Sequence, residues 1–269
     1  MKKILGLLIT LLITTQAYAS IAVAPNKIDI NANKIKSNYV TTAIEVRGDT
    51  KQTIRFKAYA GYFTISEQSK MIHHEKSDDP HNIAKKIRFV PSEFTVQPGK
   101  VQKLRINIAN LNSLPDGESR AVLYLEDVNA KEYNLDTGMP GIGAQLIVKT
   151  RMGIPIYVTK GKFTKHGEVE YLKTVKEKDG QYVEMKVKST GNSKINCFVK
   201  AQIVKDKKLV YEYNIPAKVI GGENYYIFKD KIPADKIKEK GELTLRVLIN
   251  YKDEKDKKQN LKQEVPITL

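Results

Sequence analysis

The sequence contains no tryptophan and only one cysteine, Cys197. A single cysteine cannot form an internal disulfide, so the folded chain has to be stabilised by packed hydrophobic cores. Cys197 stands in an alternating run in which Ile195, Val199 and Ile203 are also apolar. This alternation predicts a small buried thiol in a strand, and not a nucleophile.

Motifs that mark enzyme active sites are absent as well. The sequence has no serine elbow, no paired-histidine motif, no phosphate-binding glycine loop and no CxxC pair. His73, His74 and His81 cluster with acidic residues, but their spacing fits no established transition-metal site. We therefore interpret this histidine segment as a solvated loop between strands, and we predict no catalytic residue, no cofactor and no metal.

Long hydrophobic runs are confined to the N-terminus. The apolar stretch 4–13 follows Lys2 and Lys3 and precedes Ala17-Tyr18-Ala19, the pattern of a cleavable secretory signal peptide. The run is shorter than the roughly 20 residues that a membrane span needs, so we expect no stable membrane insertion. Cleavage after Ala19 leaves residues 20–269, a length that suits two domains of about 100–150 residues.

Acidic residues are in deficit, since 46 Lys and Arg face 30 Asp and Glu, for a formal net charge of +16. A basic excess can indicate nucleic-acid binding. Here the lysines are spread along the polar faces of predicted strands and in loops, which favours solubility and predicts no nucleic-acid partner.

What the sequence does contain is alternation with a period of two, with very little helical patterning. Apolar residues alternate with polar ones around Val40–Val46, Ile54–Ala60 and Leu104–Ile108, and again around Val183–Val187 and Leu243–Tyr251. Glycine, proline and aspartate turns separate these runs, for example Pro115-Asp116-Gly117 and Gly221-Gly222. The pattern predicts an all-β chain of two tandem sandwiches. The predicted first domain spans residues 20–158 and the second spans residues 163–269.

Within the first predicted domain, several short motifs follow one another in a characteristic order. They are IAVAPNKIDI from Ile21, RFVP from Arg88, FTVQPG from Phe94, QKLR from Gln102, LPDGESR from Leu114, LEDV from Leu125 and a long extended run to Val158. In this ordered set the chain resembles the PapD-like periplasmic pilus chaperones of the chaperone–usher pathway. The resemblance covers the first domain, whereas the second matches only as a small sandwich of suitable length.

The resemblance implies two immunoglobulin-like domains in a boomerang arrangement, located in the periplasm. Its partners would be pilus or fimbrial subunits and an outer-membrane usher. Such a chaperone lends a strand to an incomplete subunit, a form of β-augmentation in which alternate side chains fill pockets of the partner. The matching donor residues here are Ile142, Ala144, Leu146 and Val148. The alternative is that these four side chains face the core of their own domain.

The family also holds the C-terminal carboxylate of the subunit with two basic residues. Lys27 matches the first of these, whereas Gly153 stands where the second, a lysine, is expected. Arg151 lies two residues earlier on the same predicted strand face and is the proposed substitute, since a guanidinium binds a carboxylate through two parallel hydrogen bonds. Pro155 lacks an N–H group, so we expect strand pairing to weaken near it. Glu118 and Arg120 flank Ser119 and are interpreted as a local ion pair.

A function of a different class stays open at this point. An immunoglobulin-like surface, adhesion or structural protein would use the same exposed strand to associate with a copy of itself. A chaperone without its subunit could also cap the donor strand by forming a dimer.

Overall fold

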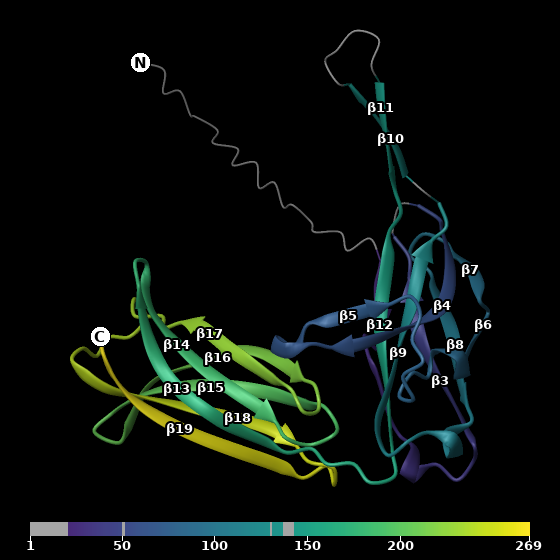
Figure 1. Ribbon diagram of the computed structural model, residues 1–269. Coiled ribbons are helices and arrows are strands. Elements are labelled where there is room, and N and C mark those ends of the chain that lie inside the picture. Colours follow the sequence, from purple (N-terminus) through teal and green to yellow (C-terminus); the bar gives the residue numbers. More distant parts are fainter. Residues whose placement is uncertain (1–20, 50–51, 130, 137–142) are drawn as a thin grey trace, which may run out of the picture.

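The computed structural model describes residues 21–49, 52–129, 131–136 and 143–269, so the predicted signal peptide and Ile142 lie outside the described residues. Within these ranges the chain forms β-strands and short 3-10 segments but no α-helix. Two β-sandwiches meet at one end and at an angle, which gives the predicted boomerang shape (Figure 1). The predicted all-β fold class is confirmed. No helix in the described part of the chain is both long enough and apolar enough to cross a membrane.

The first sandwich consists of two sheets that face each other. One sheet has the order β1-β3-β8-β6, with β1 (Ala22–Ala24), β3 (Tyr39–Arg47), β8 (Val101–Ala109) and β6 (Ile87–Val90). The other has the order β2-β12-β9-β4-β5, with β2 (Ile28–Asn31), β12 (Arg151–Lys160), β9 (Gly117–Asp127), β4 (Ile54–Ile65) and β5 (Met71–His74), and β7 (Glu93–Val96) also pairs with β4. The short segments η1 (Ala32–Lys34), η2 (Glu67–Ser69), η3 (Ala84–Lys86) and η4 (Leu111–Ser113) lie between strands.

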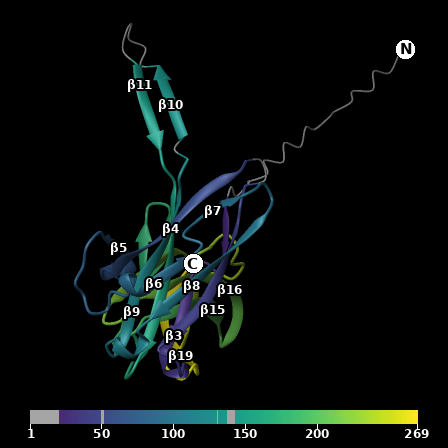
Figure 2. The same cartoon turned by 90° about the vertical axis from the view of Figure 1, so that its right-hand side faces the viewer.

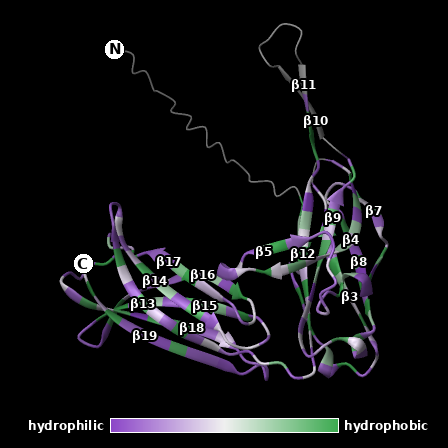
Figure 3. Ribbon diagram, in the orientation of Figure 1, coloured by the Kyte–Doolittle hydropathy of each residue, from purple (hydrophilic) through white to green (hydrophobic). Residues whose placement is uncertain are grey.

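Alternation of side chains builds the first core. In β8 the side chains of Leu104, Ile106 and Ile108 are fully buried, while their neighbours Lys103 and Arg105 face solvent. The same alternation along other strands is visible in the hydropathy colouring of Figure 3. Successive residues of a strand point to opposite faces, so each sheet contributes one apolar face to the space between them.

The second sandwich has a three-stranded and a four-stranded sheet. The first has the order β13-β14-β17, with β13 (Gly167–Glu177), β14 (Gly180–Ser189) and β17 (Tyr225–Lys231). The second has the order β16-β15-β18-β19, with β16 (Lys208–Ile220), β15 (Ile195–Lys205), β18 (Glu242–Lys252) and β19 (Lys258–Thr268). Cys197 is buried in this core, as predicted, and burial raises the pKa of its thiol to about 12.

Pairing along β12 does not weaken at Pro155, so that expectation is wrong. The ladder between β12 and β9 runs without interruption from Arg151 opposite Glu126 to Lys160 opposite Gly117. From Ile156 onward β12 also pairs in parallel with β2 on its other side. One missing N–H donor does not end the ladder, because β9 and β12 remain paired on both sides of the proline.

The long extended run before Val158 is not one continuous strand. It is divided into β11 (Gly143–Val148) and β12, which begins at Arg151. β11 pairs with β10 (Lys131–Asp136), and these two strands form a hairpin of their own that projects beyond the first sandwich (Figures 1 and 2). The break occurs where Asp127 accepts a hydrogen bond from the backbone N–H of Asn129 through its side chain, which turns the chain between β9 and β10.

Candidate functional site

The projecting hairpin exposes apolar side chains on β11. The exposed fractions of Leu146, Ile147 and Val148 are 47%, 55% and 38%. Leu146 and Val148 do not belong to the hydrophobic core of the first sandwich. Ala144 lies on the same strand face by alternation, but its side chain is outside the described part of the structure, as is all of Ile142.

The backbone of β11 is also accessible on one side. Among the described strands, β10 is the only one that pairs with β11, and the two form a separate two-stranded sheet. A strand edge that pairs with no other described strand, next to apolar side chains, is able to accept a further strand from another chain. The hairpin therefore has both elements that β-augmentation requires.

At the base of this hairpin, Arg151 lies over an aromatic platform. Its guanidinium carbon is 4.2 Å from the centroid of the Tyr124 ring, and Nη1 donates a hydrogen bond of 3.3 Å to the hydroxyl of Tyr59. The Tyr59 hydroxyl in turn donates to Glu126 over 2.7 Å. Burial and the hydrogen bond to Glu126 raise the pKa of Tyr59, although the hydrogen bond from Arg151 opposes this, so the phenol stays neutral. The exposed guanidinium keeps further N–H donors for an incoming carboxylate.

Gly153, which replaces the expected lysine, makes room for this platform. A Cβ atom at Gly153 would lie 3.1 Å from Val122 Cγ2 and 3.7 Å from the Tyr124 ring, and one at Gly61 would lie 2.4 Å from the same ring. Glycines on the strands at both sides of β9 thus allow Tyr124 to lie close to the sheet.

Replacing Gly153 by lysine is therefore expected to harm the fold. The new Cβ would press against Val122 Cγ2, and the lysine side chain would compete with Arg151 for the face of the Tyr124 ring, at an overpacking cost of about 1–3 kcal/mol. Urea denaturation of the Gly153→Lys variant measures this cost. Lys149→Arg at the exposed base of the hairpin is the control, and it should leave the free energy of unfolding unchanged. Unchanged stability of Gly153→Lys would contradict the close packing described here.

Lys27 lies at the junction of the two sandwiches, in the bend just before β2. Its Nζ donates to Asn196 Oδ1 of the second sandwich over 3.0 Å and lies 3.4 Å from Asp29 Oδ2. The side chain remains partly exposed. Lys27 is therefore a partly exposed cation at the junction of the sandwiches.

The structure does not bring Lys27 and Arg151 together. Because Ile28 pairs with Ile156, Lys27 lies beside Pro155, four residues along β12 from Arg151. At about 3.3 Å per residue their backbone positions are roughly 13 Å apart. Each cation has its own contacts here, Lys27 with Asn196 and Asp29, and Arg151 with Tyr59 and Tyr124.

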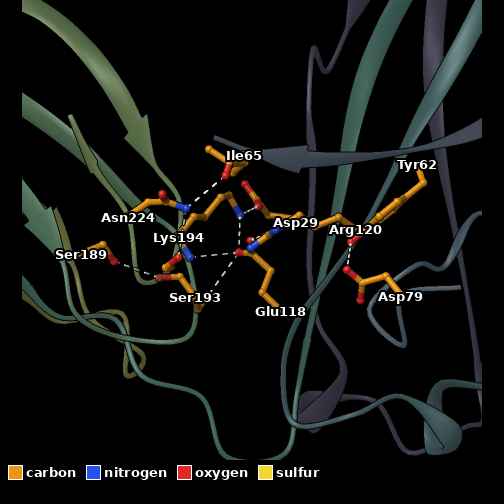
Figure 4. Close-up of polar contacts among 11 residues, drawn as sticks. Asp29, Tyr62, Ile65, Asp79, Glu118, Arg120, Ser189, Ser193, Lys194 and Asn224 are labelled. Carbon is orange, nitrogen blue, oxygen red and sulfur yellow. Dashed lines mark hydrogen bonds and ion pairs between the residues drawn. The ribbon is translucent and has the colours of Figure 1, made fainter. Parts of the chain in front are cut away.

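A buried ionic network joins the sandwiches beside Lys27 (Figure 4). Glu118 accepts hydrogen bonds from Arg120 Nε at 3.0 Å, from Ser193 Oγ at 3.1 Å and from the Lys194 backbone at 3.2 Å. The Lys194 ammonium lies 3.4 Å from Glu118, contacts Asp29 and lies 3.6 Å from the centroid of the Tyr157 ring. The predicted local pair of Glu118 and Arg120 is present, but it is one part of an interdomain network.

Within this network, pairing with lysines lowers the pKa of Asp29 by more than its partial burial raises it. Partial burial raises the pKa of that carboxyl, but the charge and hydrogen bond of Lys194, with a smaller contribution from Lys27, hold it below its ordinary value. Lys165 lines a cavity of about 310 Å³ at the same junction. Burial and the nearby charge of Lys194 lower the pKa of its ammonium group.

The histidine segment is not the solvated loop that we predicted. His73 and His74 lie in strand β5 and are bonded to the sheet, His73 to the Tyr124 hydroxyl at 2.6 Å and His74 to Thr64 Oγ1 at 2.8 Å. His81 lies in the segment that hydrogen-bonds to Arg120. Across the described residues, no group of three or more His, Cys, Asp or Glu side chains is arranged to hold a metal ion.

Comparison with known proteins gives matches among solved structures. A class 5 fimbriae chaperone, CfaA, matches at 13% identity and a TM-score of 0.44, over 92% of this chain and 100% of that one. The CsuC–CsuE chaperone–tip adhesion subunit complex from the archaic chaperone–usher Csu pili of Acinetobacter baumannii matches at 14% identity and a TM-score of 0.46, over 91% and 98%. The CupB2 chaperone of Pseudomonas aeruginosa matches at 12% identity and a TM-score of 0.42, over 91% and 100%.

These are likenesses of structure at low identity, and no role of this chain is drawn from them. No protein-family model and no curated protein sequence matches the chain.

Several residues of the site were not found from the sequence. Tyr59, Tyr124 and Glu126 carried no signal of their own, although a glycine inside a strand, such as Gly153, can indicate a close approach. Lys194 and Asn196 belong to the second sandwich, and their partners Asp29 and Lys27 are 165 and 169 residues away. Such pairs follow from the relative position of the two domains, which strand periodicity does not describe.

Proposed function

We propose that this chain is a periplasmic assembly chaperone that binds pilus-like subunits by lending them strand β11 and delivers them to an outer-membrane usher. The observation that carries the proposal is the β10–β11 hairpin, which holds exposed Leu146 and Val148 on a strand with an accessible edge. A soluble chain gains nothing for its own core from these side chains, since they lie outside it.

The physical basis of binding is completion of a partner's sandwich. Main-chain hydrogen bonds along β11 would supply affinity, and side chains at every second position would enter apolar pockets of the partner. Fully burying a leucine or valine side chain contributes about 1.5–3 kcal/mol. Ile142, Ala144, Leu146 and Val148 are the proposed pocket-filling residues.

Two cations on this side of the first sandwich are proposed to orient the subunit. Arg151 lies at the base of the hairpin with its guanidinium exposed, and Lys27 lies at the junction of the sandwiches. Their backbone positions are about 13 Å apart along β12, a gap that two long side chains can close, so we propose that they hold the C-terminal carboxylate of the subunit. Arg151, with its planar fork, is the better match for a carboxylate.

The test is co-expression of the full chain, including its export signal, with pilin-like reading frames encoded beside it. We expect a subunit to co-purify with the chain from periplasmic extract. A variant in which residues 131–148 are replaced by Asn-Gly should remain folded but lose the subunit, because its two sandwiches do not depend on the hairpin. Equal recovery of the subunit with the shortened chain would contradict strand lending.

The same preparation distinguishes the chaperone from a self-associating surface protein. Without a subunit, a chaperone is expected to elute as a monomer or as a dimer that dissociates when the subunit is added. A stable oligomer that requires the hairpin and excludes every subunit tested would favour the surface protein.

A further inference from the structure

Strand β4 leaves its sheet after Gly61. Up to that point β4 pairs with β9, the last pair being Gly61 and Val122. Further along β9, the neighbouring position is taken by another segment: Arg120 N donates to His81 O over 2.8 Å, and Ile83 N donates to Arg120 O over 3.1 Å. The end of β4 then pairs with β5 alone, and this β4–β5 hairpin is directed toward the second sandwich (Figure 1).

The hairpin is held firmly against the outer face of the first sandwich. The Phe63 side chain is completely buried and packs with Val122, Tyr124 and Tyr157 in a small cluster separate from the main core. The rings of Phe63 and Tyr157 meet edge to face, with centroids 5.6 Å apart. A hairpin anchored in this way is a rigid extension of the first domain.

The tip of this hairpin, residues 65–70, contacts the second sandwich. Asn224 Nδ2 donates to the backbone oxygen of Ile65 over 3.1 Å, a contact drawn in Figure 4, and the Tyr225 hydroxyl donates to Glu67 Oε2 over 3.2 Å. Gly221 faces Ile65 so closely that a Cβ atom there would lie 3.0 Å from Ile65 Cβ. The Gly221-Gly222 turn thus receives the tip, and Gly221 is the point of closest approach.

We propose that the β4–β5 hairpin is an interdomain brace that fixes the angle between the two sandwiches. The linker between β12 and β13 and the ionic network at Glu118 join the domains at one place. A single contact region of this kind permits rotation of one domain against the other, as in hinged proteins. The tip adds contacts beyond that region, so the relative position of the sandwiches is set before any partner binds.

This inference does not depend on the proposed function, because the brace would fix the angle whatever the partner is. The sequence indicated Gly221-Gly222 only as a turn, and it gave no signal for the contact partners Ile65, Asn224 and Tyr225. These residues act through the position of the second domain.

The distance between the domains tests the brace. Spin labels would be placed at two exposed positions, Lys103→Cys on the first sandwich and Lys258→Cys on the second. The distance between the two labels would be measured by pulsed electron–electron double resonance in the full mature chain. Cys197 is buried with a raised thiol pKa, so it should not react with the label. The labelled parent chain should give one narrow distance distribution.

Two variants loosen the tip in different ways. Gly221→Leu inserts a side chain between the turn and Ile65, and we expect the narrow distribution to be replaced by a broad one. Tyr225→Phe removes only the hydrogen bond to Glu67, and we expect about a fivefold rise in the population with the tip released, the equivalent of about 1 kcal/mol. Tyr182→Phe is the matched control, because Tyr182 donates an equivalent bond to Asp179 within the second sandwich.

A narrow distribution in Gly221→Leu that coincides with that of Tyr182→Phe would overturn the brace. If Gly221→Leu does not fold, the double variant Asn224→Ala/Tyr225→Phe decides, because it removes both side-chain donors of the contact without adding bulk. A distribution in the double variant as narrow as that of the control would overturn the proposal, and a broadened one would support it.

Discussion

Replacing Glu118 by glutamine is expected to remove about 3–5 kcal/mol from the free energy of unfolding, the range measured when one partner of a buried ion pair is lost. The Glu118 side chain is fully buried, and the Lys194 side chain is only 4% exposed. Without the carboxylate, Arg120 and Lys194 would each lose the buried anion that they share, although Lys194 would keep its pair with Asp29. This is a large part of the total stability of an ordinary domain.

The substitution should also separate the two domains. Glu118 belongs to β9, whereas Ser193 and Lys194 belong to the second sandwich, so its loss weakens the junction as well as the first domain. Urea denaturation followed by tyrosine fluorescence and by circular dichroism should show one transition for the parent chain and two for the variant. Coincident transitions indicate that the domains unfold together.

A matched control uses an exposed pair of the same chemistry. Glu93 accepts a hydrogen bond from Arg55 over 2.9 Å at the surface of the first sandwich. Exposed pairs of this kind contribute about 0–1 kcal/mol, so Glu93→Gln should change stability little. If Glu118→Gln costs no more than Glu93→Gln, the network does not stabilise the junction.

Much of the fold could be predicted because it depends on local alternation. In β15 the residues Ile195, Cys197, Val199, Ala201 and Ile203 are all buried, as their spacing predicts. The same holds for Ile44 and Val46 in β3. A half-buried strand imposes a period of two on its sequence, so the pattern is visible without knowledge of the partner strand.

The features that could not be predicted from the sequence depend on which strands are neighbours in the sheet. The departure of β4 from its sheet after Gly61 follows from the segment 81–83 taking its place beside β9. The break between β11 and β12 lies where Asp127 N donates to Thr150 O over 2.9 Å, beside the turn that Asp127 forms with Asn129. Pro155 had little effect because β9 supports β12 on both sides of it. In each case a contact distant in sequence takes part.

The strongest effect on binding is expected from Leu146→Glu. If β11 is inserted into a subunit, Leu146 lies in an apolar pocket, and the variant loses about 1.5–3 kcal/mol of apolar burial in addition to the cost of desolvating a charge. We expect the affinity for the subunit to fall by at least about 100-fold, since 1.4 kcal/mol corresponds to tenfold. Titration calorimetry or surface binding with a purified subunit measures this loss.

Ile147→Glu is the matched control, because Ile147 is the next residue on the same strand and is even more exposed than Leu146. Successive side chains of a strand point to opposite faces, so Ile147 would face away from the pockets that Leu146 and Val148 fill. We expect this variant to retain most of its affinity. Both variants change an exposed residue outside the core, so both should unfold like the parent chain. Equal losses at the two positions would mean that the hairpin does not bind as an alternating strand, and a loss at Ile147 alone would assign the opposite face of β11 to the subunit.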